Sequence, residues 1–233
     1  DALLPHAQQR SREQRQWRDS DPPLPVIFLS HGAPPLFDDG PWMSQLLDWS
    51  TSLAKPRAIV IISAHWESAP LSITAPAAGT PLVYDFGGFA PRYYAMEYAT
   101  PDATALAATL AALMPADEPL HQHAARGLDH GAWVPLKVMY PLADVPVLQL
   151  SLPTHDPQRL MEIGRRLRPL REQGVLVIGS GFMTHGLPFL TAEMMQGGQV
   201  PGWSADFDAW AQDAVERKDV DSLAGYRLSL IHI

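Results

Sequence analysis

The sequence predicts an α/β fold, a single domain with a central, mainly parallel sheet flanked by helices. Apolar runs without polar alternation, rich in β-branched residues, are typical of strands buried on both faces. The chain has such runs at residues 26–30, 58–63, 145–150 and 175–180. Segments with helical spacing of apolar residues alternate with these runs. Strands that alternate with helices favour a parallel sheet covered on both sides.

The predicted helices have recognisable starts. Thr100-Pro101-Asp102 places a capping residue and a proline before one helix, and Asp156-Pro157 opens another. A third is expected from about Ala205 to Glu216. The apolar stripes, in the same order, are Leu106, Leu110 and Leu113, then Leu160, Ile163, Leu167 and Leu170, then Phe207, Trp210 and Ala214. Each stripe gives its helix one face to bury against the sheet.

Composition limits the possible functions. A chain of 233 residues, of which 46% are hydrophobic, is long enough for one well-filled core. The net charge is −8 and no run of Lys or Arg occurs, which excludes a phosphate-tracking nucleic-acid surface. No apolar stretch is long enough to cross a bilayer, so we expect a cytoplasmic protein without a membrane partner. Because the chain has no cysteine, disulfides and thiolate metal sites are excluded.

Both ends of the chain differ from its middle. Residues 1–24 are polar and rich in Arg and Gln, without the apolar core of a signal peptide, and we expect a tail that contributes little to the fold. The domain would then span residues 25–227. Residues 228–233 form a short apolar run with nothing after it to pair with, and we expect a non-native-looking tail there.

Three histidines follow buried strands. His31 comes directly after the first run, His65 two residues after the second, and His185 five residues after the last. In open α/β sheets, ligands bind beyond the carboxyl ends of the strands, where residues from different strands converge. Neutral imidazole is also the commonest metal ligand. One such histidine is more often a hydrogen-bonded loop residue, but three at equivalent strand ends favour a metal site.

Other segments could complete this site. His130 lies between glycines and beside Asp129, a carboxylate that could orient it. Residues 84–89, Tyr-Asp-Phe-Gly-Gly-Phe, form an aromatic and glycine-rich loop. Such a loop is typical of a lid over a flat apolar ligand, and equally of a hydrophobic surface loop. His121 and His123 follow a proline in a polar loop and are expected to face water.

The motifs, in their order along the chain, resemble those of the class III extradiol ring-cleaving dioxygenases, and most nearly the DOPA 4,5-dioxygenase branch. They are Ser-His-Gly-Ala-Pro at 30–34, Ser-Ala-His-Trp-Glu at 63–67, Tyr-Asp-Phe-Gly-Gly-Phe at 84–89, Leu-Asp-His-Gly-Ala-Trp at 128–133 and Gly-Ser-Gly-x-x-Thr-His at 179–185. The resemblance covers roughly residues 25 to 225. It implies a mononuclear non-haem metal, Fe(II) for ring cleavage or Zn(II) as in related bacterial proteins. It also implies that a small aromatic diol and O2 react to give a muconic semialdehyde.

The resemblance assigns roles by position. His31 and His65 match the first two metal ligands of the family. His185 matches a histidine that acts either as the acid/base beside the metal or as a further zinc ligand. His130 matches a catalytic histidine one shell further out, which contacts oxygen and substrate. The aromatic residues expected to line the substrate pocket are Trp66, Tyr84, Phe86 and Phe89.

One family motif is not found in the chain. Family members have a later His-Pro-x-x-x-His-x-x-Pro-Leu segment that supplies the last ligand. We therefore expect an incomplete domain, truncated at its C-terminus, with weakened metal binding and activity. His232 lacks the flanking prolines of that motif, so we expect it to lie far from His31 and His65.

Two other functions fit the same histidines. A zinc hydrolase could generate hydroxide from a bound water, with Glu67 or Asp129 as the carboxylate base. A non-catalytic metal-binding module is the second alternative, because a fold can persist while its function changes. Metal content would separate the binding module from both enzymes if no metal were found. Only the dioxygenase converts a catechol and O2 to a yellow ring-opened product, so that reaction separates the two enzymes.

Overall fold

The computed structural model describes residues 3–189, 191–195 and 200–226. The chain divides into two compact units, residues 1–155 with 160–181 and residues 156–159 with 182–233. The first unit contains the sheet and the second is helical. None of the described helices is both long and apolar enough to cross a membrane.

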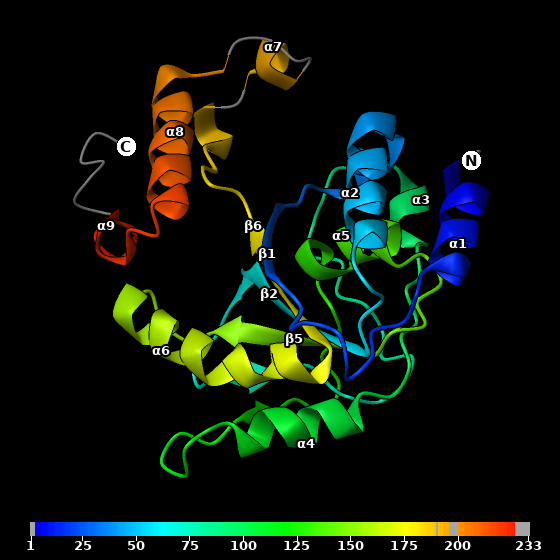
Figure 1. The fold of residues 1–233 in the computed structure, drawn as a ribbon. Helices are drawn as coiled ribbons and strands as arrows, with labels where there is room; N and C mark the ends of the chain where they lie inside the picture. The colour runs from blue at the N-terminus through cyan, green and yellow to red at the C-terminus, as the bar shows by residue number, and fades with distance from the viewer. Residues whose placement is uncertain (1–2, 190, 196–199, 227–233) are drawn as a thin grey trace. The chain divides into compact units, whose positions relative to one another are not determined.

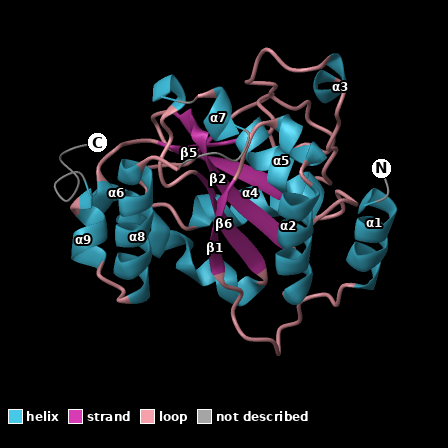
Figure 2. Ribbon diagram, turned by 90° about the horizontal axis from the view of Figure 1, so that it is seen from above, coloured by secondary structure: helices cyan, strands magenta, loops and turns pink. Residues whose placement is uncertain are grey.

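A mainly parallel sheet lies at the centre of the first unit (Figure 1). In the described residues it has six strands in the order β1-β6-β2-β5-β3-β4, and only the β3–β5 pairing is antiparallel. Figure 2 shows β1, β6 and β2 side by side. The strand bounds are β1 (Val26–Ser30), β2 (Ala58–Glu67), β3 (Ser72–Ile73), β4 (His121–Gln122), β5 (Val147–Leu152) and β6 (Val175–Gly181). The predicted α/β class and mainly parallel sheet are confirmed.

Helices cover both faces of this sheet. Their bounds are α2 (Gly40–Ser52), α4 (Thr104–Ala112), α5 (His130–Met139) and α6 (Pro157–Leu167). Successive residues of a strand point to opposite faces, so each strand serves two cores. Ile59 and Ile61 of β2 share a buried cluster with α2 and α5, whereas Val60 shares another with α4 and α6. The runs of β2, β5 and β6 lack alternation because both faces of these strands are buried. β1 differs from the prediction, because Val26 and Phe28 are 59% and 47% exposed and only the face of Ile27 and Leu29 is buried.

The strands end close to where the sequence predicted, with two differences. β5 begins after Pro146, which cannot donate to a neighbouring strand. β2 continues past its predicted end to Glu67, and its register against β5 shifts between Ile62 and Glu67. His65 therefore lies in the irregular last part of a strand rather than in the loop after it.

The N-terminal segment differs from the tail that we expected. Residues 3–13 form α1 (Leu3–Glu13), and Ala7 of this helix is buried. Trp17 and Leu24 are 4% exposed, and Trp17 N donates to Lys55 O at 2.9 Å. A few well-spaced apolar residues therefore anchor a segment whose average composition is polar, and the described part of it belongs to the packed fold.

The second unit contains α8 (Gly202–Glu216) and α9 (Val220–Ala224), with shorter turns η3 (Leu187–Phe189) and α7 (Ala192–Met195) before them. α8 matches the helix predicted from about residue 205. Of its predicted stripe, Ala214 is buried, whereas Phe207 and Trp210 are half-buried, with ring centroids 5.4 Å apart. The tail predicted at 228–233, including His232, lies outside the described residues.

Candidate metal centre

Three histidines from different elements converge in the first unit. His31 directly follows β1, His65 lies near the end of β2, and His130 is the first residue of α5. Their ligand nitrogens all lie within 4.8 Å of one another, the condition for a shared metal ion. His31 and His130 are buried, whereas the His65 side chain is 29% exposed. The structure therefore brings together two of the three predicted ligands, His31 and His65, and adds His130 to them.

The spacing of His31 and His65 fits metal binding. Their Nε2 atoms are 2.9 Å apart. Two metal–nitrogen bonds of about 2.0–2.1 Å place their nitrogens about 2.9 Å apart at a right angle and about 3.4 Å apart at the tetrahedral angle. Two Nε2 lone pairs at this separation can bind one ion. Imidazole also suits iron and zinc alike, so the donor set fits either metal.

Hydrogen bonds fix the tautomer of His31. The Ser180 hydroxyl donates to Gly131 O at 2.6 Å, and the same oxygen lies 2.9 Å from His31 Nδ1. Because its only proton is used on the carbonyl, Ser180 Oγ accepts from His31 Nδ1–H. His31 Nε2 is then the unprotonated ring nitrogen, on the side of His65. A second polar group that fixes the ring and tautomer in this way is typical of metal-binding histidines.

Asp85 holds His130. Its Oδ1 atom accepts from His130 Nδ1 at 2.7 Å and from His130 N at 3.0 Å. Its Oδ2 atom lies 3.7 Å from His65 Nδ1. One carboxylate thus contacts two of the three histidines. Sequence analysis missed this role, because Asp85 is 45 residues from His130 and only its place in the Tyr84–Phe89 motif hinted at the site.

The carboxylate of Asp85 is stabilised in its charged form. Burial alone would raise the pKa of Asp85, but hydrogen bonds from the His130 ring and backbone, together with the charge of that ring, outweigh this effect. The pKa of Asp85 therefore lies below its ordinary value. An ionised Asp85 accepts only, so the His130 ring donates to it through Nδ1, which leaves Nε2 as the ring nitrogen available for another contact.

Gly131 allows the histidines to approach one another. A Cβ atom at this position would lie 2.3 Å from Ser63 Oγ, 2.9 Å from His31 Cε1 and 3.0 Å from His65 Cδ2. Such distances are closer than packed atoms tolerate. The backbone of α5 thus lies directly against both predicted ligands, at a position where only glycine fits.

The Gly131→Ala variant is expected to lose metal affinity by about 10-fold or more, because the added methyl group displaces two imidazoles from a shared ion. Metal titration of purified protein measures this loss. Gly164→Ala is the matched control, since a Cβ at Gly164 in α6 meets no atom within 4 Å. Equal affinity in the Gly131 variant and the control would contradict the tight packing described here.

Aromatic rings border the cluster on the side of His130. The Phe86 ring lies 5.8 Å from the His130 ring, edge to face, and Phe89 and Tyr84 lie 6.0 and 6.1 Å from Phe86. Three of the four predicted pocket residues thus form one group beside the histidines. Trp66 differs, because it is buried below Arg126, whose guanidinium carbon lies 4.4 Å from its ring centroid.

The carboxylates considered as hydrolase bases have other contacts. Glu67 lies 3.5 Å from His155, and both side chains are more than half exposed. Asp129 is fully buried and accepts from Gln149 Nε2 at 2.5 Å. It does not orient the His130 ring, because Asp85 occupies that position. Within the described residues, the carboxylate that contacts the cluster is Asp85.

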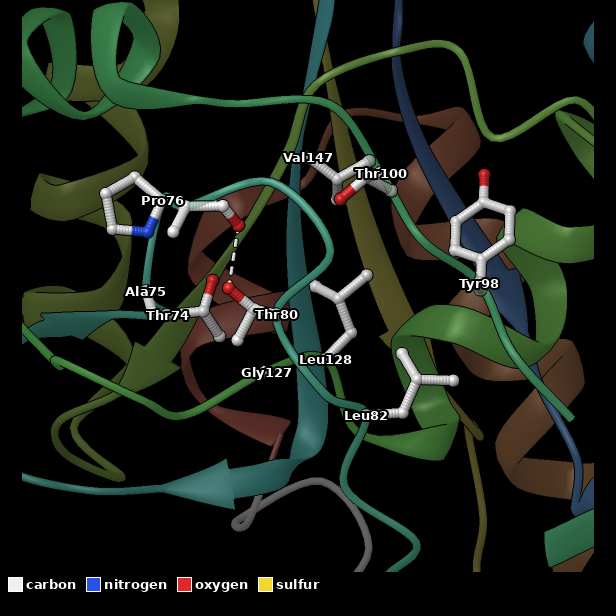
Figure 3. A pocket seen from close by; sticks show the side chains of 11 residues that line it. Thr74, Ala75, Pro76, Thr80, Leu82, Tyr98, Thr100, Gly127, Leu128 and Val147 are labelled. Carbon is white, nitrogen blue, oxygen red and sulfur yellow. Dashed lines mark hydrogen bonds between the residues drawn. The ribbon is translucent and has the colours of Figure 1, made fainter. Parts of the chain in front are cut away.

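A small cavity lies elsewhere in the first unit, lined by Thr74, Thr80, Leu82 and Leu128 among others (Figure 3). Figure 3 shows the Thr80 hydroxyl directed to the Ala77 carbonyl, to which it donates at 2.7 Å. The space open to the centre of a water molecule is about 10 Å³, roughly enough for one water. None of the three histidines lines it, so this cavity is not the substrate site.

His185 belongs to the second unit. Its side chain is exposed, and its ring lies 5.8 Å from that of Phe182. The loop around it packs on the start of α8, where Thr184 and Ser204 share a hydrogen bond of 2.7 Å. The predicted roles of His185, as metal ligand and as acid/base, stay predictions.

Known proteins are similar to this chain over most of its length. The family model described as the catalytic LigB subunit of aromatic ring-opening dioxygenase matches residues 28–230. The 4,5-DOPA dioxygenase extradiol of Beta vulgaris is 38% identical over 208 residues, which cover 86% of this chain and 76% of that protein. The protein of the same name from Escherichia coli K12 is 36% identical, over 70% of this chain and 61% of that protein.

A solved structure is also similar to this chain in fold and in sequence. The crystal structure of an uncharacterized protein from Escherichia coli K12 superposes with a TM-score of 0.60 at 30% identity, covering 74% of this chain and 64% of that one. The chain thus spans less than two thirds of both bacterial relatives. The parallel sheet, the converging histidines and the match over residues 28–230 agree: the chain belongs to the family of the catalytic LigB subunit of aromatic ring-opening dioxygenase, the extradiol class of these enzymes.

Proposed function

We propose that this chain opens the ring of a catechol-type, DOPA-like aromatic with O2 to give a muconic semialdehyde, both oxygen atoms entering the product. The observation that carries the proposal is the convergence of His31, His65 and His130 beside an aromatic group. The names of the relatives from Beta vulgaris and Escherichia coli support DOPA as the model substrate. The proposed metal is Fe(II), held by His31 and His65, and His185 would be a further ligand if the native metal were Zn(II).

Each part of the site would contribute one function. When bound, Fe(II) would supply open positions for the catechol oxygens and O2 and lower the pKa of the catechol hydroxyls. Phe86 lies edge to face with His130 and would border the flat ring of the substrate. His130 would bond to oxygen or substrate through Nε2, because its Nδ1 is held by Asp85. His185 would remove the second catechol proton and later return one, as a histidine near neutral pKa can.

The proposal is tested by adding L-DOPA and simple catechols to iron-loaded protein under air. We expect a yellow product and the uptake of one O2 per ring opened. Anaerobic protein is the control and should give no product until air is admitted. Iron-loaded protein that consumes no O2 with any catechol would contradict the proposal, and zinc uptake with hydrolytic activity instead would favour the hydrolase.

The His185→Ala variant is expected to retain bound iron while turnover falls by about 100-fold or more, the usual scale for a lost acid/base. Steady-state rates and iron content measure the two effects separately. His121→Ala, an exposed histidine of β4, is the matched control. Unchanged turnover would rule out the acid/base role, and iron loss as large as that of a His65 variant would make His185 a ligand instead.

A further inference from the structure

Asp129 directly precedes His130, but its side chain neither caps α5 nor orients the His130 ring, which bonds to Asp85. Asp129 occupies the N-cap position of α5, where an aspartate side chain normally accepts from the first backbone amides. Here the side chain makes no capping bond, and Asp85 accepts from His130 N instead. The Asp129 carboxylate is fully buried and points to another partner. Burying a charged carboxylate away from water costs free energy, which hydrogen bonds and nearby opposite charges must offset.

The partner of Asp129 is Gln149, in the middle of β5. Asp129 N donates to Gln149 Oε1 at 3.0 Å, and Gln149 Nε2 donates to Asp129 Oδ2 at 2.5 Å. The Gln149 backbone is fixed as well, because its N–H donates to Thr74 Oγ1 at 3.0 Å and its carbonyl accepts from Thr74 N at 3.1 Å. Gln149 is fully buried with all four polar groups bonded, so it links the sheet rigidly to the start of α5.

A cation lies beside this network. Arg126 Nη2 lies 3.6 Å from Asp129 Oδ2, and its guanidinium lies over the ring of Trp66, the residue after His65. On the other side, Gly131 O accepts from Ser180, which holds His31. A shift of the first turn of α5 would therefore disturb more than His130. The chain of contacts from Gln149 passes through residues 129–131 to the hydrogen bond that orients His31.

We propose that the hydrogen-bonded Asp129–Gln149 pair is a positioning device that holds His130 in reacting position beside His31 and His65. This inference rests on the proposed function and extends it to residues that touch neither metal nor substrate. A purely stabilising pair would change the melting temperature alone. A positioning pair changes kcat while bound iron and KM stay near their wild-type values, because it governs geometry rather than ligand count.

The test compares two substitutions in the full chain loaded with iron. Gln149→Met fills the same space but removes both bonds, and kcat for L-DOPA should fall about 10- to 100-fold, the effect of a small misplacement. Asp129→Asn combined with Gln149→Glu exchanges amide and carboxylate, so that both bonds can form again. This exchanged variant should keep kcat within about threefold of wild type, in the manner of a double-mutant cycle.

Gln9→Met is the matched control, because Gln9 also donates to a carboxylate, that of Glu13, but on the exposed face of α1. If Gln149→Met does not fold, Gln149→Asn replaces it, since the shorter amide cannot reach Asp129. A kcat equal to that of the control, or an exchanged variant as slow as Gln149→Met, would overturn the proposal.

A second measurement separates this proposal from the proposed function. Hydrogen exchange of the peptide that spans the start of α5 requires no turnover. In Gln149→Met it should become faster at residues 129–131 than in wild type and in the exchanged variant. If the wild-type protein opens no catechol ring, the proposed function fails. The hydrogen exchange of Gln149→Met would still decide whether the pair holds the start of α5. Unchanged exchange in Gln149→Met would refute the positioning role by itself.

Discussion

The His65→Ala variant is expected to lose iron binding by more than about 100-fold and ring opening with it, while the fold persists. Loss of a partner outside the metal ligands already costs roughly 10- to 100-fold in affinity, so loss of a ligand exceeds this. His65 Nε2 lies 2.9 Å from His31 Nε2, and both belong to the cluster that also contains His130. The imidazole is partly exposed and contributes little apolar burial.

Iron content after loading and desalting measures the first effect, and circular dichroism with thermal unfolding measures the second. His155→Ala is the matched control, because His155 follows the end of the adjacent β5 but is exposed beside Glu67. It should bind iron as wild type does. A His65 variant that retains stoichiometric iron would show that the cluster is not the metal centre.

The Asp85→Ala variant is expected to keep iron but to lose about 100-fold in kcat, because two bonds to His130 disappear together. Without the carboxylate, the His130 ring can rotate and its Nδ1 proton is no longer fixed. Asp85→Asn should fall between wild type and alanine, since an amide oxygen still accepts but carries no charge. Steady-state kcat and KM with L-DOPA measure the effect.

Asp85 accepts from the first backbone amide of α5, so its alanine variant also removes a helix cap. Asp39→Ala is the control for that effect. Asp39 caps α2 by accepting from Trp42 N at 3.0 Å, far along the chain from the histidines. Removing that cap should cost about 1 kcal/mol of stability without changing kcat. If both alanine variants lowered stability alike and left kcat unchanged, Asp85 would be a helix cap and nothing more.

The sequence predicted the features that depend on local pattern. β2 and β6 are recognisable because residues facing two cores are apolar on both sides, and His31 and His65 follow from where such strands end. The aromatic group around Phe86 was predicted from its motif. These features need no knowledge of which distant segments meet.

Features that depend on tertiary contacts were missed or misjudged. Adjacency favoured Asp129 as the partner of His130, but neighbouring residues at a helix start point in different directions, and Asp85 reaches the ring from a separate loop. The average polarity of residues 1–24 concealed Trp17 and Leu24, which are individually buried. No periodic pattern in a single sequence encodes such pairings.

The bond between His31 and Ser180 has a consequence for folding. It joins residues 149 positions apart, Ser180 of β6 and His31, which directly follows the neighbouring strand β1. Closing so long a loop is entropically costly, and the candidate ligands His31 and His65 are themselves 34 positions apart, so no short peptide of this chain contains both. A metal held by these histidines would therefore not nucleate the fold as it would at a local His-x-x-His segment. It would bind the assembled sheet and shift the equilibrium toward it by mass action, so that unfolding and metal release would form a single linked event.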